Sequence, residues 1–90
     1  MPRYMVERTF PDGLHIPTDD EGAAALGGVV ATNAGEGVTW VHSYVSADKK
    51  KTFCVYDAPS PDAIRTVAEK NGLPVGDIHE VRVLDPYFYH

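Results

Sequence analysis

The sequence predicts an α+β domain in which a four-stranded antiparallel sheet carries two helices on one face. Four segments alternate apolar with polar residues or are rich in β-branched and aromatic residues, as strands are. Two further segments carry the signals that start and end helices. No repeat or long linker interrupts the 90 residues, so we expect a single domain over residues 1–90.

The opening part of the chain predicts the first strand and the first helix. Residues 3–9 alternate around Tyr4 and Val6, which we expect to face inward, and the turn sequence Pro-Asp-Gly ends the strand. Thr18 and Glu21 then have the spacing of a capping box, in which each side chain satisfies a backbone donor at a helix start. Apolar residues recur every three or four positions in this helix, and the predicted core-facing stripe is Ala23, Leu26, Val30 and Ala34.

The middle of the chain predicts a hairpin followed by a second helix. Residues 38–46 and 51–57 form the two arms of the hairpin, and residues 47–50 form its tip. Ser60 is expected as the N-cap of the helix and Pro61 as its first residue. The predicted inner face of this helix is Ile64, Val67 and Ala68, and Asn71 with Gly72 ends it.

The fourth strand is predicted over residues 77–84. The resulting order of strand, helix, strand, strand, helix and strand is that of the ferredoxin-like βαββαβ fold, with both helices on one face of the sheet. Aromatic residues after Pro86 would expose a large apolar surface if they met only water. We therefore expect Tyr87, Phe88 and Tyr89 to pack along the sheet, as a possible extra C-terminal strand, or against a partner subunit.

Period-two alternation assigns side chains to the sheet face without helices, called the open face below. We pair Val45 with Phe53 and Ser43 with Val55, which turns the apolar side chains of the hairpin toward the helices. The open face then carries Trp40, His42, Tyr44, Cys54 and Tyr56. A face that meets only water usually carries small polar residues, so we expect another molecule to cover this one.

The first and last strands add charged groups to this face. Alternation points Glu7 to the open face, beside Cys54, and in the last strand it points Glu80 and Arg82 there, with Val81 toward the helices. A carboxylate, an imidazole, a thiol and a phenol are then close together. These groups are the ingredients of a metal site or of acid–base catalysis.

Composition argues against several classes of function. The net charge is −5, and no basic stripe with interleaved aromatic residues suggests nucleic-acid binding. No apolar run approaches the roughly 20 residues that cross a membrane. The single Cys54 cannot form an internal disulfide, so we expect a cytoplasmic location. Because a chain this short buries only about 60% of its unfolded surface, we also expect a homodimer.

Four blocks of the chain resemble the small bacterial nickel-binding proteins of ferredoxin-like fold. The blocks are residues 1–13 (MPRYMVERTFPDG), 37–46 (GVTWVHSYVS), 52–61 (TFCVYDAPSP) and 80–89 (EVRVLDPYFY). The resemblance implies a homodimer, not an enzyme, that binds Ni²⁺ near the dimer surface and acts in nickel sequestration or homeostasis. Candidate metal ligands within the matching blocks are His42, Glu7, Cys54, Tyr44 and Glu80, and His15 is a further candidate outside them.

Each candidate ligand also has a structural interpretation. His42 is either a ligand or a hydrogen-bonded histidine of an interface, and Glu7 either binds metal or pairs with Arg82. Cys54 is either a ligand or a small buried hydrophobic residue. His15 is either a solvated loop residue or part of a coordination sphere that a second subunit completes.

An alternative function is that of a dimeric ferredoxin-like isomerase or cofactor-free oxygenase. In that case the open face forms a substrate pocket lined by Trp40, Tyr44 and Tyr56, and His42 or Glu7 acts as the base. A pocket of roughly 300 Å³ or more on this face would favour catalysis. Tight packing of one sheet face on another would favour a metal-binding dimer.

Overall fold

The computed structural model describes residues 1–15 and 20–87 of the chain. It confirms the predicted order of elements and most of their bounds. The elements are β1 (Arg3–Thr9), α1 (Asp20–Gly35), β2 (Thr39–Val45), β3 (Lys51–Asp57), α2 (Pro61–Asn71) and β4 (Ile78–Val81). The predicted capping residue Thr18 lies outside the described residues, so the capping box stays a prediction.

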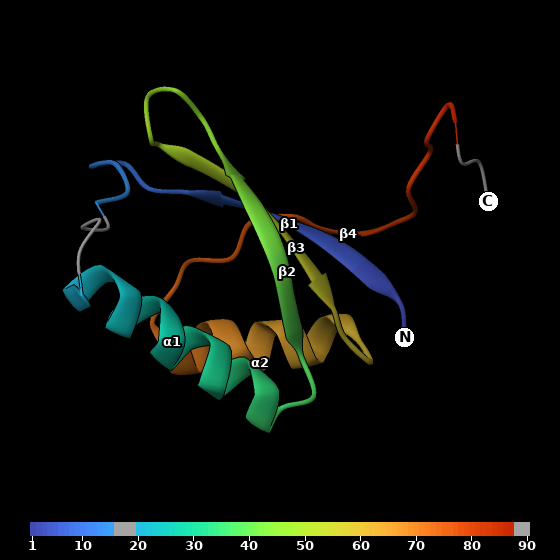
Figure 1. The fold of residues 1–90 in the computed structure, drawn as a ribbon, viewed down its shortest axis with the longest axis horizontal. Helices are drawn as coiled ribbons and strands as arrows, with labels where there is room; N and C mark the ends of the chain where they lie inside the picture. The colour runs from blue at the N-terminus through green and yellow to red at the C-terminus, as the bar shows by residue number, and fades with distance from the viewer. Residues whose placement is uncertain (16–19, 88–90) are drawn as a thin grey trace.

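The four strands form one sheet in the order β2-β3-β1-β4, and every pair of neighbours is antiparallel. Both helices lie on the same side of this sheet, so the other face is left open (Figure 1). This arrangement is the predicted ferredoxin-like fold. Neither described helix has the length and apolar character needed to span a bilayer.

Strand β4 is shorter than the strand predicted over residues 77–84, because β1, the strand it pairs with, ends there. Val81 pairs with Arg3, the first residue of β1, so the residues after Val81 have no strand to bond. Through Tyr87 the described chain forms no extra strand, and it leads away from the helices (Figure 1). Tyr87 is 87% exposed and does not pack on its own sheet, so the other predicted alternative, contact with a partner subunit, stays a prediction for this residue. Phe88 and Tyr89 lie outside the described residues.

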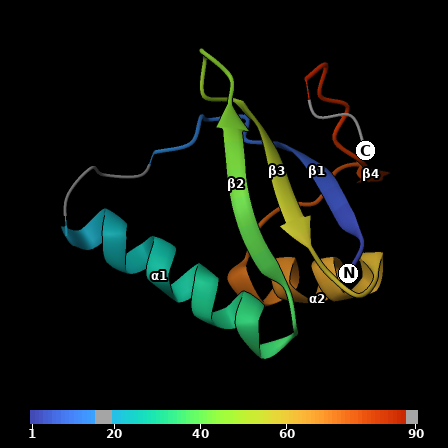
Figure 2. The same ribbon diagram turned by 45° about the vertical axis from the view of Figure 1, so that its right-hand side comes forward.

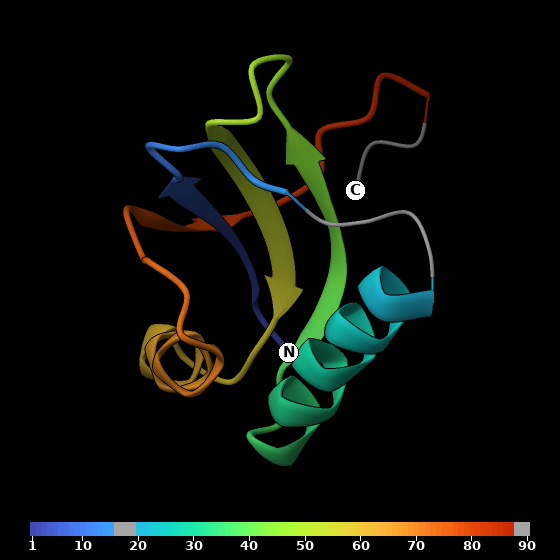
Figure 3. The ribbon, with the colours of Figure 1, turned by 90° about the vertical axis from the view of Figure 1, so that its left-hand side faces the viewer.

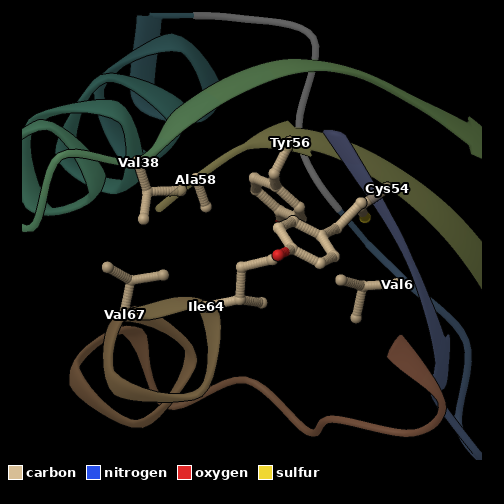
Figure 4. Close-up of a cluster of buried hydrophobic side chains, with 8 residues drawn as sticks. Val6, Val38, Cys54, Tyr56, Ala58, Ile64 and Val67 are labelled. Atoms are coloured by element: carbon tan, nitrogen blue, oxygen red, sulfur yellow. The ribbon is translucent and has the colours of Figure 1, made fainter. Parts of the chain in front are cut away.

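Helix α2 forms as predicted and builds the core. The Ser60 hydroxyl accepts a hydrogen bond from the backbone N–H of Ala63, which satisfies a donor that the first turn leaves free. Gly72 ends the helix in the left-handed conformation, at φ 68°. Ile64 and Val67 reach from α2 toward the sheet (Figure 4). They pack in one buried cluster with Tyr4, Val6, Val38, Cys54, Tyr56 and Ala58.

Helix α1 is turned relative to the prediction. Its buried residues are Gly22 and Asn33, whereas Ala23 and Ala34 of the predicted stripe are exposed and Val30 is half exposed. Small and apolar residues occur all round this helix, so their spacing does not distinguish one stripe from its neighbour. Figures 2 and 3 place α1 on the β2 side of the sheet and α2 under β1 and β3.

Candidate functional site

The register of the hairpin decides which side chains reach the open face, and it differs from the prediction by one residue. Val45 lies opposite Thr52 instead of Phe53, and Ser43 lies opposite Cys54 instead of Val55. The pairing is irregular between Trp40 and His42, where Val41 is the extra residue on β2. Because side chains alternate between faces, this shift sends the whole of β3 to the opposite face from the predicted one.

Three of the five residues predicted for the open face therefore face the helices. Cys54 and Tyr56 are 7% and 3% exposed and belong to the core cluster, and Trp40 packs against this cluster from its position opposite Tyr56. Phe53 and Val55 take their places on the open face. Nearly every residue of β3 suits a buried strand, so the sequence of β3 alone did not fix its phase.

His42, Tyr44 and Glu7 do share the open face, as predicted. One row across the sheet runs from Tyr44 through Phe53 to Glu7. The neighbouring row runs from His42 through Val55 and Met5 to His79. The cross-strand partners in each row point to the same side of the sheet, away from Tyr4 and Val6 in the core.

The rings of His42 and Tyr44 contact each other edge to face. Their centroids are 5.1 Å apart, and their planes meet at 87°. Both side chains are exposed, with Tyr44 at 58%. An aromatic ring at this distance limits the orientations of the exposed imidazole.

Glu7 forms an ion pair that the sequence did not predict. Its carboxylate accepts a hydrogen bond from the ammonium of Lys51, and this contact raises the pKa of Lys51. The prediction that Glu7 lies beside Cys54 is wrong, because Glu7 lies opposite Phe53. The alternative that Glu7 pairs with Arg82 is also wrong, because its partner is Lys51. The Cys54 thiol instead lies 3.6 Å from the Thr52 hydroxyl, on the helix side of the sheet.

A second ion pair lies at the other end of the same face. Arg3 donates from Nε and Nη2 to the two carboxylate oxygens of Asp57, at 2.8 and 3.1 Å. This contact holds the pKa of Asp57 below its ordinary value and raises that of Arg3. The carboxylates of Glu7 and Asp57 are therefore already paired with cations.

The remaining candidates do not join this group. Glu80 lies opposite Tyr4, on the helix-facing side of the sheet, and Val81 lies opposite Arg3 on the open face, which reverses the predicted phase of β4. His15 lies in the exposed loop after β1, where its Nε2 is 3.1 Å from the carbonyl oxygen of Asp12. His79 does reach the open face, and only the register of β4 with β1 reveals this.

Within residues 1–15 and 20–87, no three His, Cys, Asp or Glu side chains are placed to hold a metal ion together. His42 and His79 share a row but are separated by β3 and β1, a span of three strand spacings or about 14 Å. One ion cannot bind both imidazoles of the same chain over this span. The described chain therefore presents separate donor groups on this face.

The aromatic pocket expected on the open face lies on the other side of the sheet. Trp40 and Tyr56 line a cavity of about 520 Å³, together with Leu26 and Val29 of α1. Tyr44 is not part of it. The location predicted for this pocket was wrong for the same reason as the faces of Cys54 and Tyr56, namely the one-residue shift in the hairpin.

Comparisons with known proteins agree with this architecture. The crystal structure of SCO4226 from Streptomyces coelicolor A3(2) matches with a TM-score of 0.71 at 24% sequence identity, over 92% of this chain and 99% of that chain. No significant match is found among curated proteins. A family model described as "Nickel responsive protein SCO4226-like" matches residues 4–81. This match spans most of the sequence, and the chain therefore belongs to the SCO4226-like family of nickel responsive proteins.

Proposed function

We propose that the protein binds Ni²⁺ on its open sheet face as a homodimer and acts, without catalysing a reaction, in nickel sequestration or homeostasis. The observation that carries this proposal is that His42 and Glu7 share an uncovered face, with Tyr44 and His79 beside them. Membership of a nickel responsive family supports the choice of metal. With its single cysteine, the protein is proposed to act in the cytoplasm.

The chemistry of the face suits nickel. Imidazole is a good ligand for Ni²⁺, which lies high in the affinity order of divalent ions, and a carboxylate can complete its coordination sphere. His42 is exposed and oriented by Tyr44, so it is the first donor we assign. Cys54 and Glu80 lie on the helix-facing side and have no part in this proposal.

A second copy of the chain supports the proposal in two ways. The described donors of one chain are too far apart to enclose an ion, so donors from a partner are needed. The face also carries apolar area, with Tyr44 exposed and Met5 and Phe53 half buried. Covering such an area by a second sheet is how a small domain gains stability.

Glu7 binds metal in this proposal only after it releases Lys51. The two side chains form an ion pair, so Ni²⁺ and the Lys51 ammonium compete for the same carboxylate. Lys51→Met should therefore tighten nickel binding. Lys50→Met is the matched control, because it removes the same charge from an exposed neighbour that forms no ion pair among the described residues.

The test is calorimetric titration of the untagged chain with Ni²⁺, with the mass of the assembly measured by light scattering. His42→Ala should weaken binding at least about tenfold, since loss even of a group that supports a ligand costs about 10- to 100-fold. Binding should also weaken at acid pH, because only neutral imidazole binds metal. An unchanged titration for His42→Ala would remove His42 from the site, and equal effects of Lys51→Met and Lys50→Met would remove Glu7.

A further inference from the structure

Arg8 is a buried cation with no counter-ion among residues 1–15 and 20–87. The residue is 2% exposed; its Nη1 donates to the Tyr56 hydroxyl at 3.1 Å, and its guanidinium carbon lies 5.5 Å from the centre of the same ring. Its buried Nε has no hydrogen-bond partner. No carboxylate of the described chain pairs with it. An arginine stays charged in proteins, so this arrangement is costly unless an anion completes it.

Arg8 lies in the wall of the cavity of about 520 Å³ between α1 and the helix-facing side of the sheet. This volume falls within the range of small-molecule sites, which are mostly apolar with a few placed polar groups. The described lining contains two cations, Arg8 and Lys49, and no carboxylate, although the chain as a whole carries a net charge of −5. Its apolar members include Phe10, Leu14, Leu26, Val29, Trp40 and Leu73.

We propose that this cavity binds a small apolar molecule with a single carboxylate, and that Arg8 recognises the carboxylate. Nη1 is engaged by Tyr56, so the Nε and Nη2 edge remains, and this edge pairs with a carboxylate through two parallel hydrogen bonds. The apolar body lies against Leu26 and Val29 of α1. The site is on the opposite side of the sheet from the proposed nickel site and does not depend on it.

A monocarboxylate fits better than a more highly charged anion. The lining offers one buried guanidinium, and the other cation, Lys49, is exposed on the hairpin. A second negative charge on the ligand would therefore be buried without a partner. The apolar body of the ligand can be an alkyl chain or an aryl group. Decanoate is the probe for an alkyl chain and 4-phenylbutanoate the probe for an aryl group.

Trp40 provides the measurement because it is the single tryptophan and it lines the cavity. Its indole N–H donates to the Ser43 hydroxyl at 2.8 Å, and Ser43 lines the same cavity. Titration of the full chain with decanoate should shift the Trp40 emission and raise the melting temperature. 1-Decanol should bind at least about tenfold more weakly, because it cannot form the charge-assisted hydrogen bonds. Equal binding of decanoate and 1-decanol, or no binding of either carboxylate, would overturn the proposal.

Two variants separate recognition by Arg8 from a purely structural role. Arg8→Met should lose the preference for decanoate over 1-decanol, whereas Arg65→Met, the same change at an exposed position of α2, should keep it. Val29→Phe leaves Arg8 intact and places a larger side chain where the apolar body of the ligand lies, so it should weaken the binding of both ligands even if Arg8→Met does not fold. A preference that survives in a folded Arg8→Met, or a Val29→Phe variant that binds like the original chain, would contradict the proposal.

Discussion

Helices α1 and α2 lie on the same face of the sheet, yet they contact it in different ways. Helix α2 buries Ile64, Val67 and Ala68 and has a defined residue at each end. Helix α1 is longer but buries only Gly22 and Asn33, and the cavity lies between it and the sheet. We infer that α2 supplies the stability of the core, whereas α1 leaves room for a ligand. Three predictions test this difference, in order of expected size.

The largest contrast is expected between truncations on the two helices. Ile64→Ala should lower the free energy of unfolding by about 2–5 kcal/mol, because Ile64 is fully buried and its loss leaves a cavity. Leu26→Ala, on α1, should cost less than about 1 kcal/mol, because this side chain is only partly buried and already borders a cavity. Urea unfolding followed by circular dichroism measures both. Equal costs would show that α1 is packed as firmly as α2.

Tyr56 belongs to the buried cluster under α2 and also lines the cavity beside α1. Its ionisation therefore tests whether water reaches the place where the core meets the cavity. Burial raises the pKa of Tyr56 to about 12. The ordinary value is about 10, so the unfolded chain loses this proton first as the pH rises. The contribution of Tyr56 to the free energy of unfolding should therefore be fully present below about pH 10. The free energy of unfolding should then fall between about pH 10 and 12, by at most about 3 kcal/mol.

Tyr56→Phe should flatten this alkaline loss, measured as urea unfolding at a series of pH values. Tyr44→Phe is the matched control, because Tyr44 is 58% exposed on the open face. An identical alkaline slope in the two variants would mean that water reaches the Tyr56 hydroxyl, and the boundary between core and cavity would have to be redrawn.

The smallest contrast concerns the local propensity of the two helices. Ser60→Ala should cost about 1 kcal/mol, because it removes the N-cap of α2. Gly27→Ala and Gly28→Ala should each stabilise α1 by up to about 1 kcal/mol, since an added methyl group meets nothing within 4 Å at either position. Thermal unfolding should show shifts of opposite sign. Destabilisation by either alanine would indicate that α1 packs more closely than described.

Local sequence signals were sufficient to predict an element when that element contained all of them itself. Ser60, Pro61 and Gly72 fixed both ends of α2, and its inner face followed from the spacing of Ile64, Val67 and Ala68. In α1 the same type of reasoning placed only Leu26 correctly on the sheet side, because Ala23, Val30 and Ala34 are hydrophobic without being buried. A helix that is apolar on several sides does not specify which side meets the sheet.

The candidate site was predicted only in part, because here too an apolar pattern did not always specify which side of an element is buried. His42, Tyr44 and Glu7 were assigned to one face correctly, since Glu7 is out of phase with the core residues Tyr4 and Val6 of β1, and His42 and Tyr44 lie two residues apart after the extra residue Val41. Cys54 was assigned to the wrong face, because β3 is apolar on both faces and the extra residue Val41 shifts its pairing. Arg8 received no role from the sequence, although it follows Tyr4 and Val6 at period two and therefore shares their inward phase.

The sequence by itself determined the order of the elements, the ends of α2 and the family of the protein, because these depend on patterns within short segments and on long matching blocks. The tertiary structure decided the register of β2 on β3, the turn of α1, the ion pair of Glu7 with Lys51 and the isolation of Arg8. The last three depend on residues far apart in the chain, and the first depends on an irregular pairing within the hairpin. A shift of one residue in one strand reverses the face of every side chain on the strand that pairs with it, and no local pattern records that choice.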